Sequence, residues 1–167
     1  YLQKRGTTER INPLHFGNSR GTPSKHISAG AYGKGNNPKI DGTSFSNLEG
    51  IKFGLFADIG SAYVDIYEFI VFNCEGIRAQ RCTEQKYINI YNCEVYNCTD
   101  NGNIYLQQDY IDDFENLYFG LYNTISRHSA ESHGIKTNRT VNCKNIYTYR
   151  NVKQGISVHD LCTLRYV

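Results

Sequence analysis

A small residue followed by isoleucine recurs along most of the chain, and this repeat limits the possible folds more than any other feature of the sequence. Successive isoleucines are separated by 26, 27, 31 and 21 residues. A repeat of this length is typical of a solenoid, in which each unit buries its apolar side against its neighbours. We therefore expect the isoleucines to lie one above another in adjoining parallel strands. The dipeptides are Gly50-Ile51, Gly76-Ile77, Asn103-Ile104, Gly134-Ile135 and Gly155-Ile156.

Two further sets of short apolar segments alternate with this repeat. The apolar residues are mainly Ile, Tyr, Phe and Val, which favour strands, and the chain contains no Met or Trp. Three short strands per coil predict an all-β fold, a right-handed parallel β-helix built as a single-stranded solenoid. One set comprises residues 64–66, 88–90, 117–119 and 146–148, and the other includes 70–72 and 94–96.

Other repeat architectures fit the sequence less well. Leucine-rich repeats need several leucines per unit, and helical repeats need an apolar face with helical spacing over several turns. The sequence has neither of these patterns. A β-sandwich of short strands is the remaining alternative, although the isoleucine repeat does not favour it.

The composition and the apolar pattern of the sequence change at residue 47. Residues 1–46 contain all three prolines and carry seven basic against two acidic residues, so they predict a loop-rich, basic lead-in with one short strand near 26–28. Residues 47–167 predict the β-helix coils, and we expect both ends to be fragment boundaries. A basic segment of this kind is usually solvated, so we expect no nucleic-acid partner. No apolar run of about 18 residues is present, so no membrane insertion is expected.

The cysteines fit a structural role better than a metal site. Four of them follow an asparagine, which suggests one turn position used in successive coils, with the thiol as a small buried apolar group. We expect free thiols, although an even number permits three disulfides. We also expect the amides of Asn73 and Asn97, which are 24 residues apart, to bond as a ladder. No metal or cofactor is expected. The six cysteines are Cys74, Cys82, Cys93, Cys98, Cys143 and Cys162.

The phrases Tyr87–Cys98 with Asn101–Ile104, and Lys144–Tyr149 with Gln154–Ser157, resemble repeats of the pectate-lyase-like β-helix superfamily. That superfamily includes pectin-active enzymes and the tailspike and tail-fibre proteins of bacteriophages. The resemblance covers about residues 47–160. It implies a bacterial or other anionic polysaccharide as partner, a homotrimer, and a place outside the cell or on the virion surface.

Because side chains alternate along a strand, the residues adjacent to each inward isoleucine should point outward and together form one surface. Cations, amides and a tyrosine on such a surface suit an extended anionic glycan, and ordinary solvated positions are the alternative. The first outward column is Lys52, Arg78, Tyr105, Lys136 and Ser157, and the predicted substrate-binding residues are Lys52, Arg78, Tyr105, Gln107, Lys136 and His159. The next outward positions are Gly54, Gln80, Gln107, Asn138 and His159, and the preceding positions, expected as a floor of small residues, are Gly50, Gly76, Asn103, Gly134 and Gly155.

Carboxyl groups near these strands are candidates for glycoside hydrolysis, which needs two of them. The candidate catalytic residues are Asp100, Asp112, Asp113, Glu131 and His133. Their order faintly resembles the motif series of polygalacturonases, but Cys98 and Ser132 replace expected residues and a later Arg-Ile-Lys is missing. A lyase would instead use a cation such as Arg78 or Lys136.

Three hypotheses follow from these patterns. The first is a β-helix segment of a phage tailspike or receptor-binding protein that binds a polysaccharide, with or without degrading it. The second is a stand-alone polysaccharide lyase or glycoside hydrolase, and the third is a structural virion component without a ligand. Fold alone does not separate them.

Overall fold

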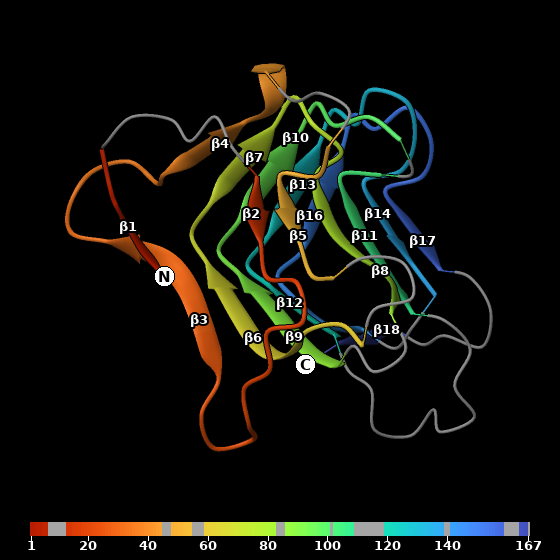
Figure 1. Ribbon diagram of the computed structural model, residues 1–167. Helices are drawn as coiled ribbons and strands as arrows, with labels where there is room; N and C mark the ends of the chain where they lie inside the picture. Colours follow the sequence, from red (N-terminus) through yellow and green to blue (C-terminus); the bar gives the residue numbers. More distant parts are fainter. Residues whose placement is uncertain are drawn as a thin grey trace.

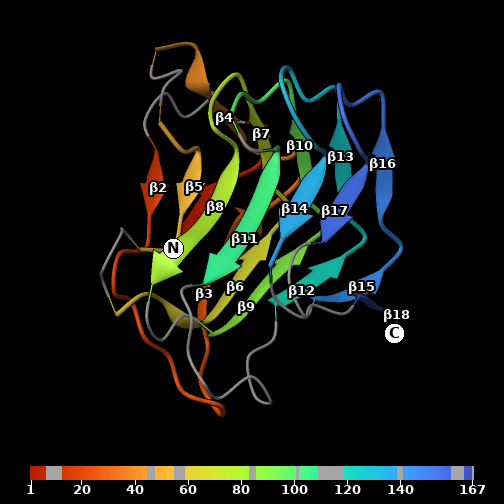
Figure 2. The same ribbon diagram turned by 90° about the vertical axis from the view of Figure 1, so that its right-hand side faces the viewer.

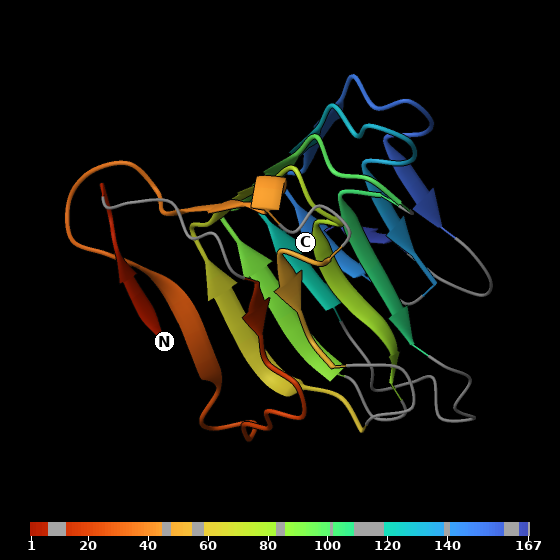
Figure 3. The ribbon, with the colours of Figure 1, turned by 45° about the horizontal axis from the view of Figure 1, so that its top comes forward.

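The chain folds as a parallel β-helix. The structure is a computed structural model, and it describes residues 1–6, 13–44, 48–54, 59–82, 86–100, 102–108, 119–138, 141–158 and 164–166. Strands recur in triplets, so β3–β5, β6–β8, β9–β11, β12–β14 and β15–β17 each form one coil. Figure 1 shows three sheets around a shared interior, and in Figure 3 the coils follow one another from β3 at the left to β17 at the right.

Each sheet takes one strand from every coil, and all strand pairs within the sheets are parallel. Sheet A contains β1 (Leu2–Lys4), β3 (Ile27–Tyr32), β6 (Ala62–Tyr67), β9 (Lys86–Tyr91), β12 (Phe119–Tyr122), β15 (Val141–Lys144) and β18 (Leu164–Tyr166). Sheet B contains β4 (Lys39–Asp41), β7 (Ile70–Phe72), β10 (Glu94–Tyr96), β13 (Ile125–Arg127) and β16 (Tyr147–Tyr149). Sheet C contains β2 (Leu14–His15), β5 (Ile51–Lys52), β8 (Ile77–Cys82), β11 (Ile104–Gln108), β14 (Ile135–Thr137) and β17 (Ile156–Val158).

The predicted isoleucine column is confirmed. Ile51 pairs with Ile77, Ile77 with Ile104, Ile104 with Ile135, and Ile135 with Ile156 across sheet C. The first four isoleucines of this column are fully or almost fully buried, and Ile156 in the last coil is partly buried. Because every coil places an isoleucine at the same position, the repeat itself sets the register of the parallel strands.

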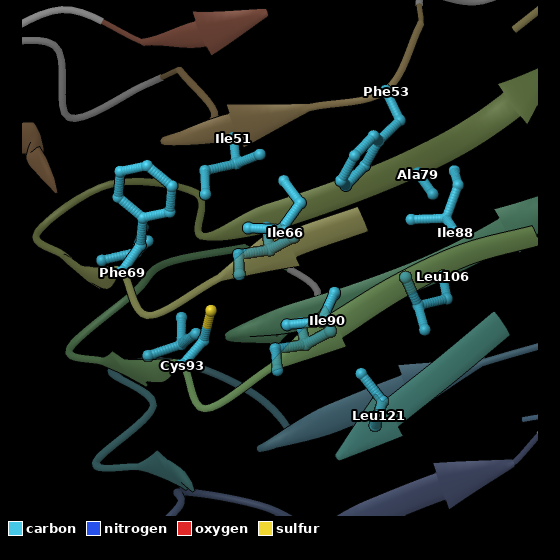
Figure 4. Close-up of a cluster of buried hydrophobic side chains, with 14 of the residues drawn as sticks. Ile51, Phe53, Ile66, Phe69, Ala79, Ile88, Ile90, Cys93, Leu106 and Leu121 are labelled. Atoms are coloured by element: carbon cyan, nitrogen blue, oxygen red, sulfur yellow. The ribbon is translucent and has the colours of Figure 1, made fainter. Parts of the chain in front are cut away.

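The interior is filled by the inward side chains of all three sheets. Ile66, Ile88 and Ile90 from sheet A lie opposite Ala79 and Leu106 from sheet C, as Figure 4 shows. A coil with strands of two to six residues cannot bury its apolar side alone, so each coil depends on contacts with the next. This stacking explains why nearly all of the core residues are Ile, Val, Leu, Phe, Ala or Cys.

The first 46 residues contribute more strand than the sequence suggested. The strand expected near residues 26–28 corresponds to β3, and β1, β2 and β4 also join the sheets. A short 3-10 helix, η1 (Gly42–Ser44), follows β4. Segments predicted as lead-in therefore pair directly with the coils, for example at Leu14 beside Ile51 and at Ile40 beside Val71.

Residues 146–148 were predicted in the wrong sheet. Residues 147–149 form β16 of sheet B, and the sheet A strand of this coil is β15, at residues 141–144. The sequence hides β15 because its outward residues, Asn142 and Lys144, are polar and its inward Cys143 is only half-buried. A strand with a single strongly apolar residue gives a weak alternation signal.

Asparagine ladders join the coils at two turns. The amide of Asn97 donates to the Oδ1 atom of Asn73 at 2.6 Å, as predicted. A second ladder runs from Asn145 through Asn123 to Asn92, with distances of 2.8 and 3.1 Å. All five residues have positive φ, a conformation that asparagine tolerates better than most residues.

The four cysteines whose side chains the structure describes are free thiols, as predicted. Cys74, Cys93 and Cys98 are buried, and Cys143 is partly buried. Burial raises the pKa of Cys93 to about 12 and that of Cys143 to about 11. Thiols with such pKa values remain protonated at neutral pH, and they act as small apolar groups in the core.

Candidate functional site

The predicted column of site residues runs across the outer face of sheet C. Lys52 pairs with Arg78, Arg78 with Tyr105, Tyr105 with Lys136, and Lys136 with Ser157. Figure 2 shows this sheet from the front, with β2, β5, β8, β11, β14 and β17 side by side. The side chains therefore lie in neighbouring strands although the sequence separates them by 21 to 31 residues. Their stacking follows from the isoleucine register.

Arg78 lies at the centre of this column and differs from expectation in its exposure. Its side chain is fully buried rather than solvated. The Nη2 group donates to the carbonyl oxygen of Thr99 at 3.2 Å and lies 3.3 Å from the Oδ2 atom of Asp100. The Nε and Nη1 groups have no hydrogen-bond partner among the described residues. Burial lowers the pKa of Arg78, and the negative charge of Asp100 opposes this shift.

Tyr105 lies between two cations. The guanidinium of Arg78 is 5.3 Å from the centre of its ring, and the Nζ atom of Lys136 is 5.1 Å away. Its hydroxyl donates to the Oε1 atom of Gln107 at 2.5 Å. Cation–π contacts and this hydrogen bond hold the ring in one orientation. Three other predicted substrate-binding residues, Arg78, Gln107 and Lys136, thus each contact Tyr105.

Carboxyl groups from the preceding turns flank this column. Glu49 is buried and forms an ion pair with Lys52. Burial, and next the negative charge of Glu49, raise the pKa of Glu75. Asp100, a predicted catalytic residue, also raises the pKa of Glu75, while Arg78 lowers it. Glu49, Glu75 and Asp100 therefore form an acidic group beside the cations, in which burial and the neighbouring negative charges favour the protonated form of Glu75.

Glu49 and Glu75 were not among the predicted site residues. Both stand immediately before the Gly-Ile dipeptide, so the tripeptide Glu-Gly-Ile occurs at 49–51 and again at 75–77. The backbone amide of Gly50 donates to the carbonyl of Gly76 at 2.9 Å, which places the two tripeptides in adjacent coils. This repeated tripeptide was the sequence signal that could have identified the two glutamates. Analysis of outward positions within strands missed it because the glutamates lie in turns.

The remaining predicted catalytic residues lie apart or outside the described structure. His133 occupies the turn position that Glu75 has two coils earlier. Its carbonyl oxygen accepts from the backbone amide of Asn103 at 3.2 Å. Glu131 is exposed, two residues earlier. Asp112, Asp113 and His159 lie outside the described residues, as does the side chain of Gln80.

The predicted floor of small outward residues is wrong. Gly50, Gly76, Asn103 and Gly134 are buried, and the strands begin one residue later, at the isoleucines. Strand alternation does not extend into a turn, where the backbone changes direction. A Cβ atom at Gly50 would lie 2.9 Å from the Sγ atom of Cys74, on the core side of the chain.

Asn103 is an internal hydrogen-bonding residue. Its amide group donates to the carbonyl oxygens of Val95 and Arg127 and to the hydroxyl of Ser126, and its Oδ1 atom accepts from the backbone amide of Cys98. These distances lie between 2.9 and 3.2 Å. Asn103 therefore joins three neighbouring segments inside the turn and is not exposed to a ligand.

The described part of the chain was compared with the requirements of a metal site and of a membrane-spanning helix. Within it, no three His, Cys, Asp or Glu side chains gather closely enough to hold a metal ion. Nor does any described helix have the length and apolar character needed to cross a bilayer.

The fold and the charged face define the class of the protein as a parallel β-helix with a mixed-charge outer sheet. Comparison with known proteins adds no closer assignment, since no family model, curated protein or solved structure matches the chain.

Proposed function

We propose that the outer face of sheet C binds an anionic polysaccharide, and that the chain is a β-helix segment of a phage tailspike or related receptor-binding protein. The observation that carries the binding proposal is the contact series Arg78–Tyr105–Lys136 across three adjacent coils. It combines two cations with an aromatic ring, the groups that bind carboxylates and the apolar side of a sugar. A homotrimer on the virion surface belongs to the same proposal and is suggested by sequence resemblance.

The buried guanidinium adds support. Unpaired donors in a protein interior are uncommon, and each one calls for an explanation. The Nε and Nη1 groups belong to a guanidinium that lies 5.3 Å from the centre of the Tyr105 ring and contacts Asp100 through Nη2. Binding a carboxylate or hydroxyl group of a glycan would use these donors. Since Arg78 is buried, the partly exposed Lys136 makes the first contact with an incoming acidic sugar.

The acidic group favours hydrolysis as a second, linked activity. A glycoside hydrolase needs one protonated carboxyl group and one carboxylate near the scissile bond. Glu75, whose pKa is raised, suits the acid, and Asp100, paired with Arg78, suits the carboxylate. Proton transfer from Glu75 to the glycosidic oxygen would break the C–O bond and release the leaving sugar as an alcohol, while a water molecule that loses a proton to Asp100 would bond to the anomeric carbon.

Binding is tested with hexagalacturonate and with capsular polysaccharides by isothermal titration calorimetry. We expect Lys136→Ala to weaken binding about tenfold, the loss typical of one charge-assisted contact. Lys144→Ala is the matched control, because it removes the same charge from the outer face of sheet A. Equal affinities for the two variants and the unmodified protein would refute the binding proposal.

Hydrolysis is tested by measuring new reducing ends and unsaturated uronate products in parallel. We expect reducing ends without unsaturated products, and we expect Glu75→Gln to abolish them while keeping affinity. Glu94→Gln is the control, since Glu94 pairs with Arg127 on sheet B. Unsaturated products would show a lyase instead, and binding without either product would leave a receptor-binding role alone.

A further inference from the structure

A histidine–aspartate pair lies on the outer face of sheet A, away from the charged face of sheet C. The Nδ1 atom of His26 is 2.9 Å from the Oδ2 atom of Asp65, although 39 residues separate the two in sequence. The inward neighbours of Asp65, Val64 and Ile66, belong to the core, so Asp65 lies on the outer side of β6. The proposed glycan face makes no use of this pair.

Asp65 is held in place from two sides. Its Oδ1 atom accepts from the amide of Asn89 at 2.8 Å, and its Oδ2 atom also accepts from the hydroxyl of Tyr67 at 3.2 Å. A buried carboxylate with these donors fixes the orientation of the histidine ring. With Nδ1 donating to Asp65, the neutral imidazole keeps a lone pair on Nε2. The His26 side chain is 29% exposed, and no described residue bonds to Nε2.

Aromatic rings adjoin this imidazole. The rings of Tyr63 and Tyr87 stack with centroids 4.6 Å apart, and the ring of His26 lies 5.6 Å from that of Tyr63 at a tilt of 57°. The stacked rings of Tyr63 and Tyr87 therefore form an apolar surface beside the imidazole of His26. Both tyrosines come from consecutive coils of sheet A, in β6 and β9.

The backbone of these tyrosines is unusual. Tyr63 and Tyr87 have φ values of 54° and 52°, in the left-handed region that bulky residues rarely adopt. Their neighbours keep the regular pairing, Ala62 with Lys86 and Val64 with Ile88. Such conformations cost free energy and concentrate at functional sites. Two successive coils keep the same costly conformation at the same position, and it carries the two aromatic rings.

We propose that His26, Asp65 and the Tyr63–Tyr87 stack form a second carbohydrate-binding site on sheet A. A sugar hydroxyl donates to the Nε2 atom of His26, and the apolar side of the sugar ring contacts Tyr63. Planar polar groups beside aromatic rings are the combination that sugar sites use, because a sugar presents hydroxyls and C–H groups together. The recognised chemistry is the sugar ring, which neutral and acidic glycans share.

The experiment follows the imidazole and tyrosine ring signals by NMR during titration with maltohexaose, a neutral probe, and hexagalacturonate, an acidic probe. We expect the signals of His26 and Tyr63 to shift on addition of at least one probe. His26→Ala should weaken that binding about threefold to tenfold, the effect of one neutral hydrogen bond. Tyr63→Asn should weaken it as well, and asparagine tolerates the left-handed backbone at this position.

Two controls separate this site from sheet C and from a purely structural role. Tyr32→Ala removes an exposed tyrosine from β3 and should leave the affinity unchanged. Lys136→Ala should leave the His26 shifts unchanged, so the sheet C proposal can fail without affecting this one. Unmoved His26 and Tyr63 signals with both probes, or unchanged affinity in both site variants, would overturn the proposal and leave the pair as a contact that joins β3 to β6.

Discussion

Replacement of Asn103 by alanine tests whether the polar interior of the turn stabilises the coil stack. The side chain is fully buried, the two hydrogens of its amide nitrogen are shared among three acceptors, and its Oδ1 atom accepts one hydrogen bond. Alanine would leave the backbone amide of Cys98 without its acceptor, which costs about 1–3 kcal/mol when the group is buried. The loss of the donated bonds adds to this, while removal of the buried amide relieves part of the cost. We expect a loss of about 3 kcal/mol.

The free energy of unfolding is measured by urea denaturation, followed by circular dichroism. Asn103→Asp should be more destabilising than Asn103→Ala at neutral pH, because a carboxylate would face the carbonyl oxygens of Val95 and Arg127. Asn36→Ala, at an exposed position, serves as the matched control. A loss below about 1 kcal/mol for Asn103→Ala would mean that the hydrogen bonds contribute little net stability and would refute this reasoning.

Three further predictions concern the ladders, the core and the outer tyrosines. Asn123→Ala should cost about 1–2 kcal/mol through loss of the bonds to Asn92 and Asn145 and through its φ of 49°, and Asn123→Gly should recover the backbone part in the same denaturation assay. Ile90→Ala should cost about 2–5 kcal/mol, because Ile90 is fully buried among stacked coils, and a midpoint within error of the unmodified protein would contradict the described packing. Burial and then the charge of Asp65 raise the pKa of Tyr91 to about 12, so a phenolate titration should show it ionising well above pH 10. Because the unfolded chain ionises first, this contribution to stability is complete below about pH 10 and is lost as the pH rises towards 12.

The parallel register could be predicted from the sequence because it depends on a single periodic feature. One isoleucine per coil has to stay in the core, and a shift of one residue would turn it outward. The asparagine ladder at Asn73 and Asn97 followed in the same way, since a turn that recurs in each coil places like residues together. By contrast, β15 was missed because only Val141 in it is strongly apolar.

The sequence predicted which residues of the candidate site lie in one column. It did not predict their burial or their contacts. Alternation gave the side of the strand for Arg78 and Lys136. It could not show that Arg78 is buried beside Tyr105 and paired with Asp100, since these contacts join residues about one coil apart in sequence. Burial, and next the charge of Glu49, raise the pKa of Glu75. The repeated tripeptide marks this position in the sequence but does not show these surroundings.

Sequence alone determined the repeat, and through it the fold class, the inward isoleucines and the order of residues along sheet C. Tertiary structure decided the burial of Asn103 and Arg78, the acidic group at Glu75, and the pairing of His26 with Asp65. The physical reason is that periodic burial is a property of each strand, whereas hydrogen bonding, desolvation and charge depend on which turns and side chains neighbouring coils bring into contact.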